Sequence, residues 1–158
     1  MNTKFISKLI VGLCLLISSY QTVSASDLIM ARSTEDFPET MLMLQNLIKK
    51  QGYVPSRVQR VDIGLTQSGY KTDKYRVVFF GKADEIKLIS EKLPDIIPYL
   101  PLKISIFAES GETILVTLDP KLFESMYPNS GFSSVFKQWQ KDIQAIFKQI
   151  RNTDSSAN

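Results

Sequence analysis

Apolar residues recur at intervals of three and four in three parts of the chain, and this is the period of an amphipathic α-helix. The first part covers residues 36–50, the second residues 84–93 and the third residues 132–150. The third pattern is the longest and carries a wide aromatic stripe, made of Phe132, Phe136, Trp139, Ile143, Ile146, Phe147 and Ile150. The sequence therefore predicts a medium, a short and a long helix, in that order.

The first predicted helix has signals at both ends. Asp36 and Glu39 have the spacing of a capping box, in which the Asp36 carboxylate accepts a hydrogen bond from the Glu39 amide. Pro38 falls in the first turn, where backbone N–H groups have no helical partner. Gly52 follows two lysines and supplies the left-handed residue that commonly ends a helix. The predicted helix therefore ends just before Gly52.

Segments typical of β-strands lie before and between these helices. Residues 61–65 alternate between apolar and other side chains, which predicts a half-buried strand. The last four of residues 75–80 are apolar, which predicts a central strand covered on both faces. Residues 102–108 and 113–118 flank a turn that contains glycine, and they predict a hairpin. Residues 28–31 predict a short leading strand.

Prolines punctuate the second half of the chain. Those at positions 94, 98 and 101 exclude regular structure from residues 94–101, which are predicted to form a rigid extended connector. Asp119 and Pro120 predict the start of another short helix, which ends before Pro128. The order of elements predicts a single α+β domain, in which helices pack on one face of an antiparallel sheet.

The N-terminus has the features of a secretory signal peptide. Two lysines precede an apolar run at residues 9–17, and Val23 and Ala25 then offer small residues at the positions that a signal peptidase reads. The run is shorter than the roughly 20 residues that a membrane span needs. We therefore expect a signal peptide at residues 1–25 and a periplasmic mature protein. An uncleaved N-terminal anchor is the alternative.

The mature chain is poor in reactive side chains. Removing 25 of the 158 residues leaves 133, with 17 basic and 16 acidic side chains, so the net charge of +1 does not suggest nucleic-acid binding. Residues 26–151 are predicted to form the domain and residues 152–158 a disordered tail. The only cysteine, Cys14, leaves with the signal peptide, and the chain has no histidine. Thiol and imidazole catalysis and the usual zinc ligands are excluded, no metal site is predicted, and a non-enzymatic role is favoured.

Basic residues concentrate in residues 49–82, which carry eight basic and two acidic side chains. Arg60 and Arg76 are predicted to lie in the middle of strands, opposite apolar neighbours, where an arginine would bind a phosphate or carboxylate through two hydrogen bonds. The alternative is a solvated sheet face on which Asp62 pairs with an arginine.

Three tyrosines provide the remaining polar candidates. Tyr70, Tyr75 and Tyr99 fall in or beside irregular segments, where a phenol can donate a hydrogen bond to a ligand or, when deprotonated, bind ferric haem. The alternative is packing in the core with a hydrogen-bonded hydroxyl group. The aromatic stripe of residues 132–150 likewise has three alternatives, namely the domain core, a dimer interface and a membrane surface.

The positions of glycine, tyrosine and proline between residues 36 and 124 resemble those of the domain-of-unknown-function family DUF302, in particular its exported members. The matching segments are residues 52–53, 61–65, 69–70, 75–81, 98–104 and 119–120. The resemblance implies a curved antiparallel sheet with helices on one side, similar to the TATA-box-binding-protein fold, and pairing as dimers. It implies no established activity. Family members often have cysteine at the position of Leu102, so a thiol role is not expected here.

The sequence thus favours a non-enzymatic, exported homodimer that binds a small anionic ligand or a periplasmic protein through its sheet face and its connector. The candidate ligand-binding residues are Arg60, Arg76, Tyr70, Tyr75, Tyr99 and Lys103. The alternative is an enzyme or redox accessory that uses tyrosines and acidic residues around a haem-type cofactor. A third hypothesis is association of the last helix with a membrane surface.

Overall fold

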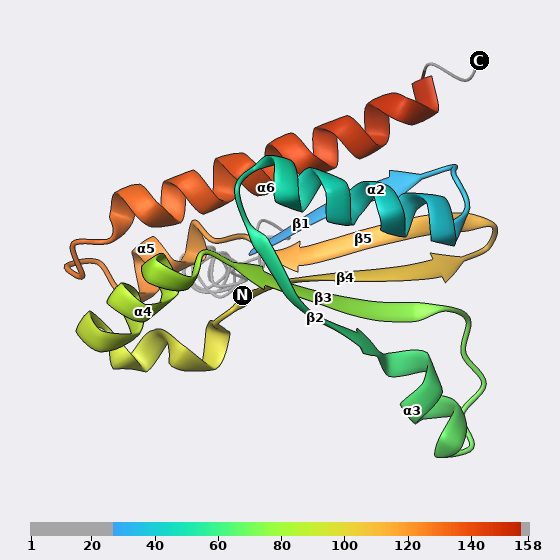
Figure 1. Ribbon diagram of the computed structural model, residues 1–158, viewed down its shortest axis with the longest axis horizontal. Coiled ribbons are helices and arrows are strands. Elements are labelled where there is room, and N and C mark those ends of the chain that lie inside the picture. The colour runs from blue at the N-terminus through green and yellow to red at the C-terminus, as the bar shows by residue number, and fades with distance from the viewer. Residues whose placement is uncertain (1–26, 156–158) are drawn as a thin grey trace, which may run out of the picture.

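The computed structural model describes residues 27–155, which form a sheet and a layer of helices (Figure 1). The predicted signal peptide and its cleavage site lie outside the described residues. The strands form one antiparallel sheet in the order β1-β5-β4-β3-β2. Their bounds are β1 Leu28–Ser33, β2 Val54–Arg60, β3 Tyr75–Gly81, β4 Leu102–Glu109 and β5 Glu112–Leu118. The leading strand and the strand at residues 75–80 are therefore present as predicted.

The central strands β4 and β5 form the predicted hairpin. Its two turn residues, Ser110 and Gly111, have φ angles of 51° and 85°. Two-residue hairpin turns commonly use this left-handed backbone, because it matches the twist of the strands that they join. The polar, glycine-containing turn thus places β4 in the middle of the sheet with β5 beside it.

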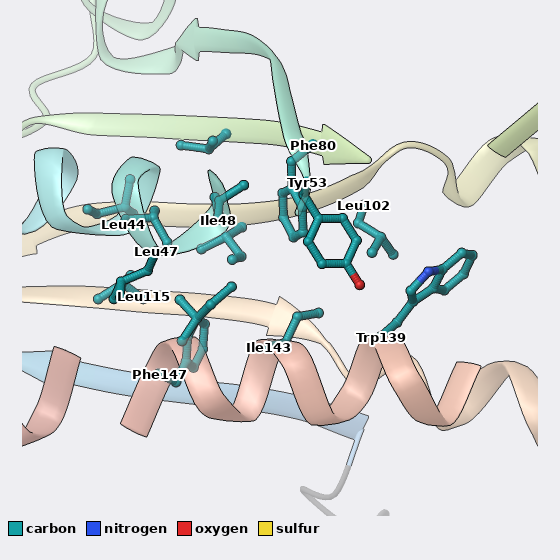
Figure 2. Packing of buried hydrophobic residues seen from close by; sticks show 14 of the residues in the cluster. Leu44, Leu47, Ile48, Tyr53, Phe80, Leu102, Leu115, Trp139, Ile143 and Phe147 are labelled. Carbon is teal, nitrogen blue, oxygen red and sulfur yellow. The ribbon is translucent and has the colours of Figure 1, made fainter. Parts of the chain in front are cut away.

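Helices α2 (Phe37–Lys50) and α6 (Ser133–Ser155) pack on one face of the sheet (Figure 1). Figure 2 shows side chains of α6, including Trp139 and Phe147, meeting residues of α2 and of the sheet in one core. Most of the aromatic stripe is almost completely buried, namely Phe136, Trp139, Ile143, Ile146, Phe147 and Ile150. The prediction of an α+β fold with helices on one face and a long C-terminal helix is confirmed, and the stripe belongs to the core.

The shorter helices α4 (Ala83–Lys92) and α5 (Leu122–Met126) match the two that the sequence predicts. Helix α6 continues to Ser155, so residues 152–155 extend the helix where the sequence predicts the start of a tail. Within residues 27–155, no helix is long and apolar enough to cross a membrane.

The strand predicted at residues 61–65 is wrong, because these residues belong to helix α3 (Val61–Gln67). The Thr66 hydroxyl donates to the Asp62 carbonyl at 2.8 Å, and the Asp62 carboxylate accepts from the Ile63 amide at 2.9 Å. Such local bonds between side chains and backbone favour a turn over a strand. No residue of α3 is buried, so the alternation of apolar residues does not report a packed face.

The extended connector predicted at residues 94–101 is also wrong. It contains a 3-10 helix, η2 (Pro94–Tyr99). The amide of Ile96 donates to the carbonyl of Leu93, and the amide of Leu100 donates to that of Ile97, both at 3.1 Å. These bonds use no proline nitrogen, so the prolines do not interrupt the short helix.

Helix α2 begins where the sequence predicts, but without the capping box. The Asp36 side chain makes no capping hydrogen bond. Instead, the hydroxyl groups of Thr40 and Thr113 each donate to the carbonyl oxygen of Glu35 at 3.1 Å. A hydroxyl network from α2 and β5 therefore fixes this end of the helix. At its other end Gly52 has the expected positive φ angle, 80°.

Candidate functional site

Arg60 and Arg76 face each other across β2 and β3. Arg60 is the last residue of β2, so the predicted mid-strand position is wrong, and its side chain is exposed. Arg76 makes an ion pair with Asp62, and its guanidinium lies 5.9 Å from the centre of the Phe37 ring. The hydrogen bond from Arg76 lowers the pKa of the Asp62 carboxyl below its ordinary value. The Arg76 guanidinium is therefore engaged within the chain, which is the alternative that the sequence offered.

The three candidate tyrosines lie in three separate places. Tyr70 follows α3 and is 65% exposed. Tyr75 begins β3 and contacts Phe107 edge to face, with ring centres 5.9 Å apart. Tyr99 ends η2 and packs on Phe123, with ring centres 5.5 Å apart. Their hydroxyl groups do not converge on one ligand position. Likewise, residues 27–155 contain no group of three or more acidic, cysteine or histidine side chains that could hold a metal ion.

The sheet face opposite α2 and α6 is mostly apolar in its middle, where Ser105 lies between Val77 and Val116, and we call it the open sheet face. Successive side chains of β3 point to opposite faces of the sheet. Val78 and Phe80 are completely buried in the core, whereas Val77 and Phe79 point to the other face and are half-buried. Within residues 27–155, the helices α2 and α6 therefore cover only one face of β3. The apolar side chains of the open sheet face are Leu28, Met30, Tyr75, Val77, Phe79, Phe107, Val116 and Ile114, of which Ile114 is only 2% exposed.

Charged side chains lie at both ends of the open sheet face. Lys103 on β4 and Arg57 on β2 are exposed and lie on either side of the same residue of β3. We call this the basic end. At the other end Glu109 lies opposite Glu112, which makes a 2.6 Å ion pair with Arg32. This acidic end carries two carboxylates and one guanidinium.

A buried polar cluster joins the segment after α2 to α6. The Tyr53 hydroxyl donates to Oδ2 of Asp142 at 2.7 Å, and Nε2 of Gln138 donates to Oδ1 of the same carboxylate at 2.7 Å. Figure 2 shows the Tyr53 hydroxyl directed toward α6. Burial, and then the hydrogen bond to Asp142, raise the pKa of the Tyr53 phenol far above its ordinary value. A phenol that stays neutral and paired connects two elements and is not suited to acid–base catalysis.

The model of the family described as "Domain of unknown function DUF302" matches residues 29–150, which is most of the chain. The chain belongs to the DUF302 family. The resemblance that the glycine, tyrosine and proline positions indicate is thus confirmed, and the description of DUF302 names no activity.

A solved structure supports the DUF302 fold. The crystal structure of an uncharacterized conserved DUF302 protein from Bacillus stearothermophilus is similar with a TM-score of 0.72, covering 80% of this chain and 100% of that chain. The two sequences are 16% identical, so the likeness concerns the fold alone. No curated protein matches the chain. A function for this DUF302 protein must therefore be argued from its own surface.

Proposed function

We propose that this DUF302 protein is an exported, non-enzymatic binding module of the periplasm that acts as a homodimer. The open sheet face is the surface that joins the two copies. The observation that carries the proposal is the apolar character of that face across the strands of the sheet. Antiparallel sheets that face water normally alternate between a buried apolar side and a polar side, and a contiguous apolar patch usually marks an interaction surface.

The occupant that the charge pattern favours is a second copy of the chain. A two-fold axis that lies between the two sheets and runs across the strands reverses the strand direction. It therefore lays the basic end of one copy, with Lys103, over the acidic end of the other, with Glu112. Because this axis keeps the lateral order of the strands, β1-β5-β4-β3-β2, each β4 lies over its mate. Two such sheets pack about 10 Å apart as an aligned sandwich.

The positions of the candidate residues favour binding over catalysis. Tyr70, Tyr75 and Tyr99 form no shared polar cluster: Tyr70 is exposed, Tyr75 packs on Phe107 and Tyr99 packs on Phe123. A small anion bound by Arg60 and Arg76 would have to compete with Asp62 for the Arg76 guanidinium. The open sheet face needs no such rearrangement, because its side chains already present an apolar surface.

The solution mass of the protein tests the pairing. Val77→Lys places an ammonium group in the middle of the open sheet face, where pairing would bury it. Leu42→Lys is the matched control, because Leu42 is 62% exposed on α2, on the other side of the molecule. We expect the wild type and Leu42→Lys to sediment as dimers and Val77→Lys as a folded monomer. A monomeric wild type, or a dimeric Val77→Lys variant, contradicts the proposal.

Export is tested separately. The lysines, the apolar run and the small residues before position 26 support a cleaved signal peptide. We expect the full-length protein, expressed in a bacterial host, to appear in the periplasmic fraction with a mass that corresponds to a start at Ser26. A cytoplasmic protein that retains residues 1–25 contradicts this part of the proposal.

A further inference from the structure

An apolar groove of about 490 Å³ lies beside the basic end of the open sheet face. The start of β2, the end of β3, helix α4 and the η2 connector line it. Its aliphatic side chains include Val54, Ile86, Ile97, Leu100 and Pro101, and its lining also includes the hydroxyl groups of two serines. Within the part of the chain that the structure describes, no charged side chain lines the groove. Its volume falls within the range of roughly 300–1,000 Å³ that is common for small-molecule sites.

Gly81 allows α4 to approach the sheet closely enough to form one wall of this groove. A Cβ atom at position 81 would lie 2.1 Å from Cδ1 of Ile86, so any other residue would force the Ile86 side chain to move. Ile86 therefore occupies the space of the missing side chain and packs over the end of β3. The groove depends on this contact between two lining residues.

The groove opens on the same side of the sheet as two cations. Val54 lies opposite Gly81, and Arg57 lies opposite Phe79, two residues earlier along β3. These positions share a face and are about 7 Å apart along the strand. Lys103 flanks Phe79 on the other side. Arg57 and Lys103 are exposed, and neither forms an ion pair within residues 27–155.

We propose that this site binds a free fatty acid, with the alkyl chain in the groove and the carboxylate on Arg57 and Lys103. An uncharged aliphatic lining favours an alkyl chain, because burying a polar or charged group there would leave it without partners. Arginine and lysine at the mouth supply the charge-assisted hydrogen bonds that a carboxylate needs. This goes beyond the proposed function by naming a ligand, and it needs no second copy of the chain, although a mate and the ligand would compete for Lys103.

A peptide added to the edge of the sheet fits the same place less well. Strand β2 is the edge strand beside the groove. Pro55 has no amide to donate to an added strand, and the register of β2 shifts between Pro55 and Arg57. Prolines, bulges and charged side chains at a sheet edge oppose pairing with another strand. The observations therefore favour a small amphipathic molecule over a peptide.

Isothermal titration calorimetry of the purified protein with dodecanoate, kept below its micelle concentration, tests the proposal. We expect saturable binding of one dodecanoate per chain and no binding of acetate. Octanoate lacks four methylene groups, so we expect it to bind about two orders of magnitude more weakly if all four are buried. Absence of saturable dodecanoate binding, or equal affinity for acetate, overturns the proposal.

Two matched variants locate the site. Ile97 and Leu88 are each 51% exposed, but only Ile97 lines the groove. Ile97→Lys should weaken dodecanoate binding at least tenfold, because it places a charge in the apolar lining, whereas Leu88→Lys should leave it unchanged. Arg57→Gln combined with Lys103→Gln should weaken it about tenfold, with little effect on dodecanol. Equal binding by Ile97→Lys and Leu88→Lys contradicts the assignment.

Two further measurements distinguish fatty-acid binding from pairing of the chain and from binding to membrane lipids. Titration of the Val77→Lys variant shows whether the groove binds dodecanoate irrespective of pairing, so failure of one proposal leaves the other intact. Flotation with phosphatidylethanolamine and phosphatidylglycerol vesicles identifies the source of the alkyl chain. Vesicle binding without binding of free dodecanoate overturns the assignment of a free fatty acid.

Discussion

The buried bond between Tyr53 and Asp142 provides a sharp test of how the core is held together. Tyr53→Phe removes only the hydroxyl donor, 2.7 Å from Oδ2 of Asp142. It keeps the ring, which packs edge to face on Phe80 with ring centres 5.4 Å apart. The carboxylate of Asp142, a residue that is 8% exposed, then retains the bond from Gln138 but loses the one from the phenol. The variant therefore isolates one hydrogen bond to a buried carboxylate.

The expected cost follows from the burial of that carboxylate. Hydrogen bonds to charged groups contribute about 1.5–3 kcal/mol to stability. Leaving a buried acceptor without its donor costs a similar amount of free energy. We expect Tyr53→Phe to lower the free energy of unfolding by about 2 kcal/mol and the melting temperature by on the order of 8 °C. Tyr70→Phe makes the same chemical change at a position that is 65% exposed, and it should cost less than about 0.5 kcal/mol.

The same bond has a defined pH dependence. Burial and the bond to Asp142 raise the pKa of Tyr53 in the folded state above its ordinary value of 10.0. Folding therefore favours the neutral phenol, and its stabilising contribution is complete below pH 10 and is lost as the pH rises toward the folded-state pKa. The advantage of the wild type over Tyr53→Phe should be constant from pH 7 to about 10 and should shrink above it.

Urea denaturation between pH 7 and pH 11, followed by circular dichroism, measures both effects. Tyr53→Phe and Tyr70→Phe should differ in midpoint but not in slope, because the packing is unchanged. Equal stability of the two variants at pH 7 would refute the assigned role of the bond. A wild-type advantage that keeps its full size at pH 11 would refute the proposed protonation state.

Three further predictions concern the surface. Gly81→Ala should change stability by less than about 1 kcal/mol in thermal denaturation, because the new methyl group meets the far end of the Ile86 side chain, and displacement of that side chain should weaken dodecanoate binding. Asp62→Asn removes the ion pair with Arg76 and should cost about 1–2 kcal/mol, because both side chains are mostly covered. The lowered pKa of Asp62 means that this cost, measured by urea denaturation, is present at pH 7 and disappears as the pH falls below about 4. Saturating dodecanoate should weaken pairing in sedimentation experiments, because it occupies Lys103.

The long helix and the hairpin were predictable because local and tertiary signals agree there. The apolar stripe of α6 has the helical period, and the core buries it as that period requires. At the hairpin, the backbone of Ser110 and Gly111 takes the left-handed form that the polar turn between two apolar arms predicts. Such elements can be read from a sequence because each residue prefers locally what the fold demands.

Strand β2 and helix α3 could not be predicted from the hydrophobic pattern. Strand β2 lies at the edge of the sheet and exposes side chains on both faces, so its residues do not alternate between buried and exposed positions. The five-residue alternation of positions 61–65 is too short to distinguish a strand from an exposed helix. Hydrogen bonds from Thr66 and Ile63 to Asp62 stabilise the helix instead of a strand.

The candidate site was only partly visible in the sequence. Residues 77–80 are apolar on both faces, which signals that something must cover each side of β3, but a single sequence does not say what. Arg57 and Lys103 come together only because β3 lies between their strands. Tyr53 and Asp142 are 89 residues apart, so no local pattern links them. Sites assembled from distant segments require the register of the sheet.

The central claim is that two copies meet through their open sheet faces, and a distance between spin labels tests it most directly. Gln59 is exposed at the edge of the face, in the same cross-strand row as Val77 and Ser105. With the two-fold axis across the strands, nitroxide labels on Gln59→Cys of both copies lie on facing sheets about 10 Å apart. We predict a single distance below about 2.5 nm in double electron–electron resonance, allowing for the label arms. Absence of dipolar coupling, or a short distance for labels on Leu42→Cys instead, would contradict the account.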